Sequence, residues 1–190
     1  MIISSRYYRV MNIELNIREL INRLARLDAA SGWAGDLNPT QRAVLAYLGR
    51  ANRFSLSPSH VAEYLGTTRG TISQTFKSLL LKGYVSEIRS TQDKRAISFV
   101  LTHKGEAVAR ADGRLEFSLL DMGDATKQTL EATLTDVLRL FVQQNDGRAF
   151  GVCNTCTYFE ATKSGGYCRL LSEPLAPEET FLICHEQKSA

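Results

Sequence analysis

The sequence predicts a mainly α-helical fold of the α+β class, built around a helix-turn-helix with a β-hairpin attached. Three observations within residues 57–102 support this prediction. Capping signals bound two short helical segments, an apolar stripe runs along the second segment, and two alternating strands follow around a charged turn. Amphipathic segments flank this unit on both sides, and a short segment with all four cysteines ends the chain.

The two short helices are bounded by capping residues. Ser57 is an N-cap followed by proline at the first helical position, and Gly66 ends this helix. Thr67 or Thr68 caps the second helix, which ends at Gly83. We therefore expect two helices separated by a short turn.

The second helix has two contrasting faces. Its apolar face carries Ile72, Phe76, Leu79 and Leu80. Its opposite face is small, polar and cationic, and it carries Gly70, Ser73, Gln74 and Lys77, with Arg69 at its entry. The major groove of DNA admits a helix, and side chains of these types read the edges of its bases. This face is therefore a candidate for base recognition.

A β-hairpin is predicted directly after the two helices. Residues 84–89 and 95–101 read as strands, joined by a turn at residues 90–94. The turn region is cationic through Arg89, Lys94 and Arg95, with Asp93 among them. A helix-turn-helix followed by a basic hairpin is a winged helix. The alternative is a small α+β unit whose polar helix face only meets water, and the agreement of caps, stripe and hairpin favours the winged helix.

This stretch resembles the MarR (multiple antibiotic resistance regulator) family of winged-helix transcription factors. The resemblance covers residues 37–141 and rests on TTRGTISQTFKSLLLKGYV and on the wing sequence DKRAISFVLTHKG. The wing keeps the family's spacing, which is D-x-R, a run of strand residues and then L-T-x-x-G. Many members have proline before the D-x-R, whereas Thr91 and Gln92 stand there in this chain, which leaves the shape of the wing tip open.

The resemblance implies a homodimer that binds a pseudo-palindromic operator in double-stranded DNA. It places the recognition helix at residues 69–82, and it implies that Arg95 enters the minor groove with Asp93 steering it. The candidate DNA-binding residues are Thr68, Arg69, Gly70, Thr71, Ser73, Gln74, Lys77, Arg89, Asp93, Lys94 and Arg95.

The helical segments outside the winged helix carry more apolar surface than so small a unit needs. Residues 12–27 carry an apolar stripe, one helical pattern runs over residues 103–119, and another runs over residues 130–141. The surplus favours a dimer interface, which the resemblance also implies; the alternative is that these helices only cap their own domain. The expected organisation is an N-terminal dimerisation helix in residues 1–36, the winged helix-turn-helix in 37–102, dimerisation helices in 103–147 and a cysteine segment in 148–190.

Positive charge gathers in one stretch of a nearly neutral chain. The formal net charge is +3, but between residues 67 and 110 eight cations face three anions. Such a patch suits contact with phosphates at one place. No run reaches the length of a membrane span, and the first residues lack a signal-peptide pattern. A cytoplasmic location is therefore expected, and Met11 stays open as an alternative start.

All four cysteines lie in the last segment. Cys153 and Cys156 form a C-x2-C pair, Cys168 follows after eleven residues, and Cys184 follows after fifteen more. Disulfides are disfavoured in a cytoplasmic chain, so metal binding is the leading interpretation. The segment is too short and too rich in glycine and proline to build its own core, and a metal would supply the missing folding energy.

The identity of the metal stays open at this point. One C-x2-C pair with two isolated cysteines, among apolar and aromatic neighbours, favours an iron–sulfur cluster of the 2Fe–2S or 4Fe–4S type. Structural zinc is the alternative, although its sites often use two C-x2-C pairs. Free or redox-switching thiols are a third interpretation. His185 adjoins Cys184 and is expected to be a bystander, and His60 is expected to face solvent or a phosphate.

The predicted function is a dimeric, DNA-binding transcription regulator, as a repressor more readily than an activator. Its cysteine-bound iron–sulfur cluster would sense redox state, iron or an oxidant. One alternative is a regulator with structural zinc that responds to a small aromatic ligand. Another is an iron–sulfur electron carrier on a winged-helix scaffold. No nucleophile–base pair or carboxylate pair stands out, so no enzyme activity is expected.

Overall fold

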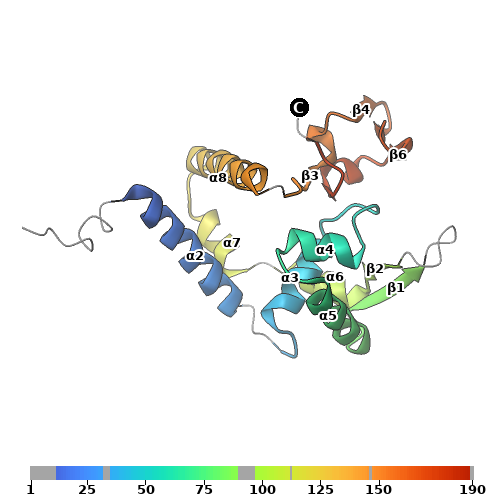
Figure 1. Ribbon diagram of the computed structural model, residues 1–190, viewed down its shortest axis with the longest axis horizontal. Helices are drawn as coiled ribbons and strands as arrows, with labels where there is room; N and C mark the ends of the chain where they lie inside the picture. The colour runs from blue at the N-terminus through green and yellow to red at the C-terminus, as the bar shows by residue number, and fades with distance from the viewer. Residues whose placement is uncertain (1–11, 32–34, 90–96, 112, 146, 189–190) are drawn as a thin grey trace, which may run out of the picture. The chain divides into compact units, whose positions relative to one another are not determined.

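The computed structural model describes residues 12–31, 35–89, 97–111, 113–145 and 147–188 (Figure 1). The chain divides into two compact units. One comprises Met1–Pro39 and Asp112–Gly123, and the other comprises Thr40–Ala111 and Asp124–Ala190. The winged helix and the cysteine segment therefore belong to the same unit. In the described part of the chain, no helix combines the length and apolarity that a membrane crossing requires.

The first unit pairs α2 (Ile13–Ser31) with α7 (Arg114–Leu120). The predicted stripe of α2 is left at the surface of the chain, with Ile17, Leu20, Ile21, Leu24 and Leu27 each at least 40 % exposed. The helical pattern over residues 103–119 proves to be two helices, α6 (His103–Ala109) and α7. Gly113 has an extended backbone at the start of α7, and glycine is a poor residue for a helix interior.

The helix-turn-helix follows the capping signals of the sequence. It consists of α4 (Pro58–Tyr64) and α5 (Arg69–Leu81), and α3 (Pro39–Leu48) precedes it. Ser57 caps α4 by accepting a hydrogen bond from the backbone N–H of His60, and Thr68 caps α5 by accepting one from Thr71. Gly66 and Gly83 both have positive φ, which glycine adopts without strain. The predicted boundaries of both helices are confirmed.

The apolar stripe of α5 forms the centre of the winged-helix core. Ile72, Phe76 and Leu79 are almost completely buried, together with Val44, Leu45 and Val61 from α3 and α4. The ring of Phe76 stacks on that of Phe99 with the centroids 4.0 Å apart. The core therefore fixes α5 with its polar face directed away from α3 and α4.

The Phe76→Ala variant tests this core. We expect it to lower the free energy of unfolding by about 3–5 kcal/mol, because it removes a buried aromatic ring and leaves a cavity. Chemical denaturation followed by circular dichroism measures the change. Leu81→Ala is the matched control on the same helix, since the Leu81 side chain is 91 % exposed. Equal stability of the two variants would contradict this assignment of the core.

The wing is an antiparallel pair of strands, β1 (Val85–Arg89) and β2 (Ile97–Leu101). Their register runs from Val85↔Leu101 to Arg89↔Ile97, which confirms the predicted hairpin in its strands. On the other side of the hairpin, the backbone N–H of Phe99 donates to Leu56 O at 3.1 Å. The wing is thus tied to the segment that leads into α4.

Thr102 and Gly105 set the junction between the wing and α6. The Thr102 side chain accepts a hydrogen bond from the Gly105 N–H at 3.2 Å and caps the helix. A Cβ at Gly105 would overlap the backbone oxygen of Tyr84. Only glycine permits this close approach, which accounts physically for the glycine in the L-T-x-x-G pattern.

The cysteine segment folds into short strands and turns after α8 (Asp124–Gln144). Its elements are β3 (Gly151–Val152), η1 (Cys153–Thr155), β4 (Phe159–Thr162), β5 (Gly165–Cys168), β6 (Glu173–Leu175), η2 (Glu178–Phe181) and β7 (Ile183–Cys184). Strands β4, β5 and β6 form one antiparallel sheet, and β3 pairs with β7. Pairing of β3 with β7 joins the two ends of the segment.

Candidate nucleic-acid interface and cysteine centre

The polar face of α5 is open to solvent. The predicted DNA-binding residues of this helix and its cap are all exposed, namely Thr68, Arg69, Gly70, Thr71, Ser73, Gln74 and Lys77. Two of them also have a structural task, because the Thr68 and Thr71 hydroxyls hydrogen-bond to each other at 2.9 Å while Thr68 caps the helix. Arg69, Gln74 and Lys77 are the long side chains of this face. The geometry therefore leaves them available to meet a ligand.

Of the DNA-binding candidates predicted in the wing, Arg89 lies within the residues that the structure describes. Arg89 at the end of β1 is exposed, and its Nε donates to Glu87 Oε1 at 2.7 Å. A phosphate approaching Arg89 would have to compete with this carboxylate. Asp93, Lys94 and Arg95 lie outside the described residues, so their predicted roles stay predictions.

Two cations of the basic stretch serve the fold instead. Lys82 donates to Gln41 Oε1 at 3.1 Å, which ties the end of α5 to α3. Lys104 donates to the backbone oxygen of Lys82 at 3.0 Å, and its Nζ lies 3.9 Å from the ring centroid of Tyr84. A count of charges along the sequence cannot separate such residues from those that face a partner.

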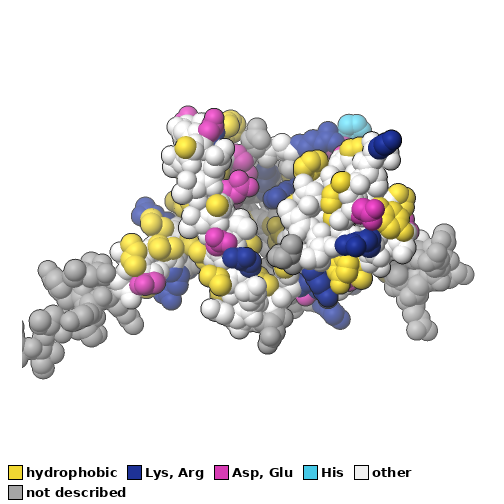
Figure 2. Space-filling view, turned by 90° about the horizontal axis from the view of Figure 1, so that it is seen from above, with side chains coloured by type: hydrophobic (Ala, Val, Ile, Leu, Met, Phe, Trp, Pro, Cys, Tyr) yellow, Lys and Arg dark blue, Asp and Glu magenta, His cyan; other side chains and the backbone are white. Residues whose placement is uncertain are grey.

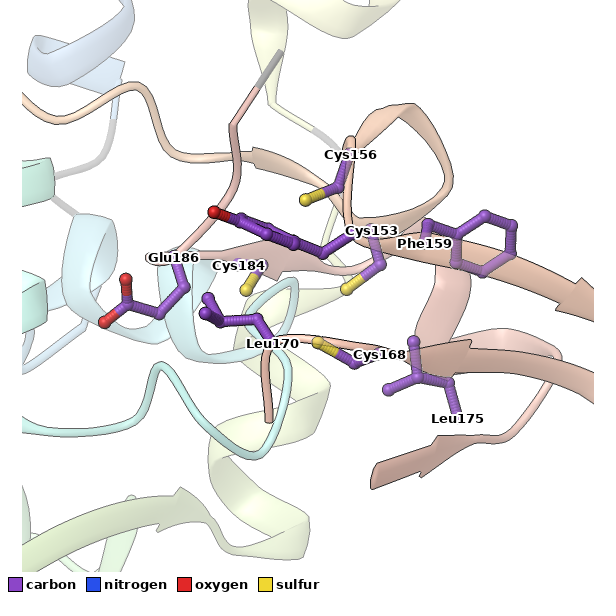
Figure 3. A pocket seen from close by; sticks show the side chains of 9 residues that line it. Cys153, Cys156, Phe159, Cys168, Leu170, Leu175, Cys184 and Glu186 are labelled. Carbon is purple, nitrogen blue, oxygen red and sulfur yellow. The ribbon is translucent and has the colours of Figure 1, made fainter. Parts of the chain in front are cut away.

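The four cysteines converge on one cavity although they come from separate turns and strand ends (Figure 3). The remaining wall is mostly apolar and consists of Tyr158, Phe159, Leu170, Leu175 and Glu186. Cys153 and Cys184 are buried, and they form a small core cluster with Leu175. Among the described His, Cys, Asp and Glu side chains, no three are arranged to hold one metal ion as they stand.

The thiols of Cys153 and Cys184 form a hydrogen-bonded pair. The hydrogen bond from Cys153 lowers the pKa of Cys184 to about 6. The same bond, together with burial, raises the pKa of Cys153. A lowered pKa favours the thiolate of Cys184, and the thiolate is the form that binds metals.

Three of the four sulfurs also receive N–H donors. The Asn52 side-chain Nδ2 donates to Cys153 Sγ at 3.3 Å, and the backbone N–H of Lys188 donates to Cys156 Sγ at 3.5 Å. A backbone hydrogen bond from Glu186 reaches Cys184 and favours its thiolate. Donors of this kind stabilise and orient metal-binding thiolates.

The linking segment, residues 50–56 between α3 and α4, forms part of this site. Its Asn52 N–H donates to Ile183 O at 2.9 Å, and the Ile183 N–H donates to Arg50 O at 2.7 Å. Phe54 packs against the cluster of buried cysteines. The small core of the cysteine segment is therefore completed by Phe54 and Asn52 of the linking segment.

Arg53 and two glutamates tie the linking segment to β6 and η2 of the cysteine segment. Both Glu179 oxygens accept from Arg53 Nη1, at 2.5 and 2.6 Å, and Glu173 accepts from Nη2 at 3.3 Å. Arg53 also donates to Pro174 O at 2.8 Å. Nothing in the sequence predicts this docking, because the partners are more than one hundred residues apart.

The winged helix matches a known protein family. Residues 35–96 match the model of the MarR family. Over these residues the winged helix is similar to a MarR-family domain. This domain ends before the first cysteine, so the cysteine segment lies outside the family model. No match was found among curated proteins.

Several solved structures share the fold of about two thirds of this chain or more. FabT of Streptococcus pneumoniae in complex with DNA is 23% identical with a TM-score of 0.55, and the match covers 73% of this chain and 99% of that one. The S. aureus MepR–DNA complex is 20% identical with a TM-score of 0.54, covering 69% of this chain and 99% of that one. A MarR regulator of Methanosarcina mazei Go1 is 19% identical with a TM-score of 0.55, covering 67% and 96%.

The winged helix meets the cysteine segment a second time through two histidines. The ring of His60 on α4 stacks on that of His185, with the centroids 3.6 Å apart, so the expectation that His60 faces solvent or a phosphate is wrong. Burial, followed by the charge of His185, lowers the pKa of His60 to about 4. Arg148 also connects the two parts, because its guanidinium forms ion pairs with Glu63 on α4 at 3.2 Å and with Glu186 next to His185 at 3.4 Å.

Proposed function

We propose that the protein is a homodimeric, DNA-binding transcription regulator, acting as a repressor, whose operator binding responds to an iron–sulfur centre held by Cys153, Cys156, Cys168 and Cys184. The observation that carries the proposal is the direct contact of the four-cysteine segment with α4 of the winged helix and with the linking segment that precedes α4.

The DNA-binding part is supported by the polar face of α5. That face is exposed, while the core holds its opposite side. The MepR and FabT structures with the same fold are described as DNA complexes. Phosphate contacts by cations would supply most of the affinity, and the side chains of α5 would choose the sequence.

Substitution of Gln74 separates sequence choice from affinity. Gln74→Ala should cost about 1–3 kcal/mol of discrimination at one base pair, because a glutamine amide can pair with adenine at two atoms. Arg95→Ala should instead weaken binding by about 1–3 kcal/mol if its side chain enters a narrow minor groove. Selection of duplexes from a random pool, followed by affinity titrations, measures both effects.

The control for these titrations is Lys163→Ala, an exposed cation of the cysteine segment. It should bind like the wild type. Unchanged affinity and unchanged base preference in both the Gln74 and Arg95 variants would refute the proposed docking. Absence of any salt-dependent duplex binding would favour an electron carrier on a winged-helix scaffold.

The metal part is supported by the chemistry of the donor set. Four thiols face one mostly apolar cavity, and N–H donors reach three of the sulfurs. Structural zinc sites often use two C-x2-C pairs, whereas this segment has one such pair and two isolated cysteines. Iron–sulfur clusters also take four thiolates, so this spacing favours a cluster. When bound, such a group would supply sensitivity to electrons, oxidants or iron supply.

A spectrum and a metal analysis of anaerobically purified protein test the metal part. Brown protein with iron and sulfide supports a cluster. Colourless protein with one zinc per chain supports the second candidate, a regulator with structural zinc that responds to a small aromatic ligand. Protein that binds neither metal refutes this part of the proposal and leaves the DNA-binding part standing.

A further inference from the structure

Asn52 is a buried polar residue that connects the winged helix to the cysteine centre. Its exposed fraction is 0 %, and its Nδ2 donates to Cys153 Sγ at 3.3 Å. Its Oδ1 accepts from the Phe54 N–H at 3.1 Å and from Ser55 Oγ at 2.7 Å. Both polar atoms of the carboxamide are therefore engaged, one toward the cysteine segment and one toward its own segment.

The hydrogen bonds around Asn52 continue toward the DNA-binding elements. Ser55 Oγ accepts from the His185 N–H at 2.9 Å, and Tyr47 donates to Ser55 O at 2.8 Å. At the end of the linking segment, Leu56 O accepts from the N–H of Phe99 in β2 at 3.1 Å. The linking segment is thus bonded to the cysteine segment along its length and to the wing at its end.

We propose that Asn52 is a positioning residue of the cysteine centre, which donates its amide N–H to the Cys153 thiolate and couples the ligation of Cys153 to the linking segment. The metal and operator readouts of this inference rest on the proposed function. An N–H donor to a ligand sulfur favours the thiolate and fixes its orientation. Because Phe54 and Ser55 hold the Asn52 oxygen, a displaced Cys153 must either break the N–H···S bond or shift the segment.

The Asn52→Asp variant removes the donor side of this arrangement and adds a negative charge, for which the control below tests. The carboxylate keeps an acceptor for Phe54 and Ser55 but has no N–H for the sulfur. We expect its affinity for zinc or iron to fall about 10–100-fold, as for other residues that support metal ligands. The ratio of operator affinities between metal-loaded and metal-free protein should also move toward one. Wild-type metal affinity together with a wild-type ratio would overturn the proposal.

The matched control is Asn154→Asp. Asn154 neighbours Cys153 in the chain but is exposed, so the variant makes the same chemical change at the surface. Its metal affinity and its operator ratio should equal those of the wild type. A loss as large as that of Asn52→Asp would attribute the effect to negative charge near the thiols and overturn the role of the hydrogen bond.

A second measurement uses wild-type protein, so that a folding defect in the variant cannot obscure the result. Addition of zinc, which is diamagnetic, should shift the NMR signal of the Asn52 side-chain amide and slow its exchange with water, because the N–H is then held by a ligand sulfur. The Asn145 amide, which donates to Phe141 O, is the internal control. An unmoved Asn52 signal in zinc-loaded protein overturns the proposal.

The failure of the proposed function can be told apart from the failure of this inference. If the wild-type protein binds neither zinc nor iron, the metal part of the proposed function is wrong. The hydrogen bond from Asn52 to Cys153 is then tested in metal-free protein with the Cys153→Ala variant, which removes the sulfur acceptor. The Asn52 amide signal must move in that variant while the Asn145 signal stays, and an unmoved Asn52 signal overturns the contact.

Discussion

Cys168→Ser is expected to lose most of the metal bound by the purified protein. Cys168 ends β5, and it faces the same cavity as Cys153, Cys156 and Cys184. Removal of one thiolate leaves a cluster or a zinc ion with an incomplete ligand set, and the binding energy that helps to fold the segment is lost with it. Metal analysis measures the loss, and limited proteolysis reports loosening of residues 148–188.

The winged helix should stay folded in this variant. Its core of Ile72, Phe76 and Leu79 does not include the cysteines, so the helical signal in circular dichroism should remain. If the centre is the sensor, the variant should also keep one DNA-binding state whether or not oxidant or iron is present. Ser164→Ala, an exposed change in the same segment, serves as the control. Full metal content in Cys168→Ser would remove Cys168 from the proposed ligand set.

The elements that the sequence predicts well are those set by local chemistry. Ser57 and Thr68 cap their helices as the pattern indicates, and Ile72 and Phe76 are buried as their spacing requires. A cap or a stripe depends on residues a few positions apart, so it can be read before the fold is known. The break between α6 and α7 was missed because the apolar repeat runs on through Gly113.

The contacts around the cysteines could not be predicted, because they join distant parts of the chain. Asn52 looked like one residue of a loop, yet it donates to a sulfur 101 positions away. His60 looked like a surface residue, yet it stacks on His185. Clustering of the cysteines correctly indicated that they gather in space. It gave no sign that Asn52 and Phe54, between α3 and α4, contact the buried cysteines.

Leu134→Glu together with Phe141→Glu is expected to turn the proposed dimer into monomers. Both side chains lie on α8 and are 44 % and 63 % exposed in the single chain. Leu130, Val137 and Leu138 share their side of the helix and are also exposed, and Figure 2 shows hydrophobic side chains at the surface of the chain. So much apolar helix surface is costly in water, and a second copy of the chain would cover it.

Loss of the dimer should also remove most of the operator affinity, because a monomer contacts only one half-site. Sedimentation velocity measures the assembly, and titration with the selected duplex measures the affinity. Ala132→Glu is the matched control, since helical spacing puts the exposed Ala132 on the opposite side of α8 from Leu134 and Phe141. A dimer with normal operator binding in the double variant would show that α8 is not the interface. The apolar face of α2 would then be the next surface to test, through Leu20 and Leu24, which are 61 % and 50 % exposed.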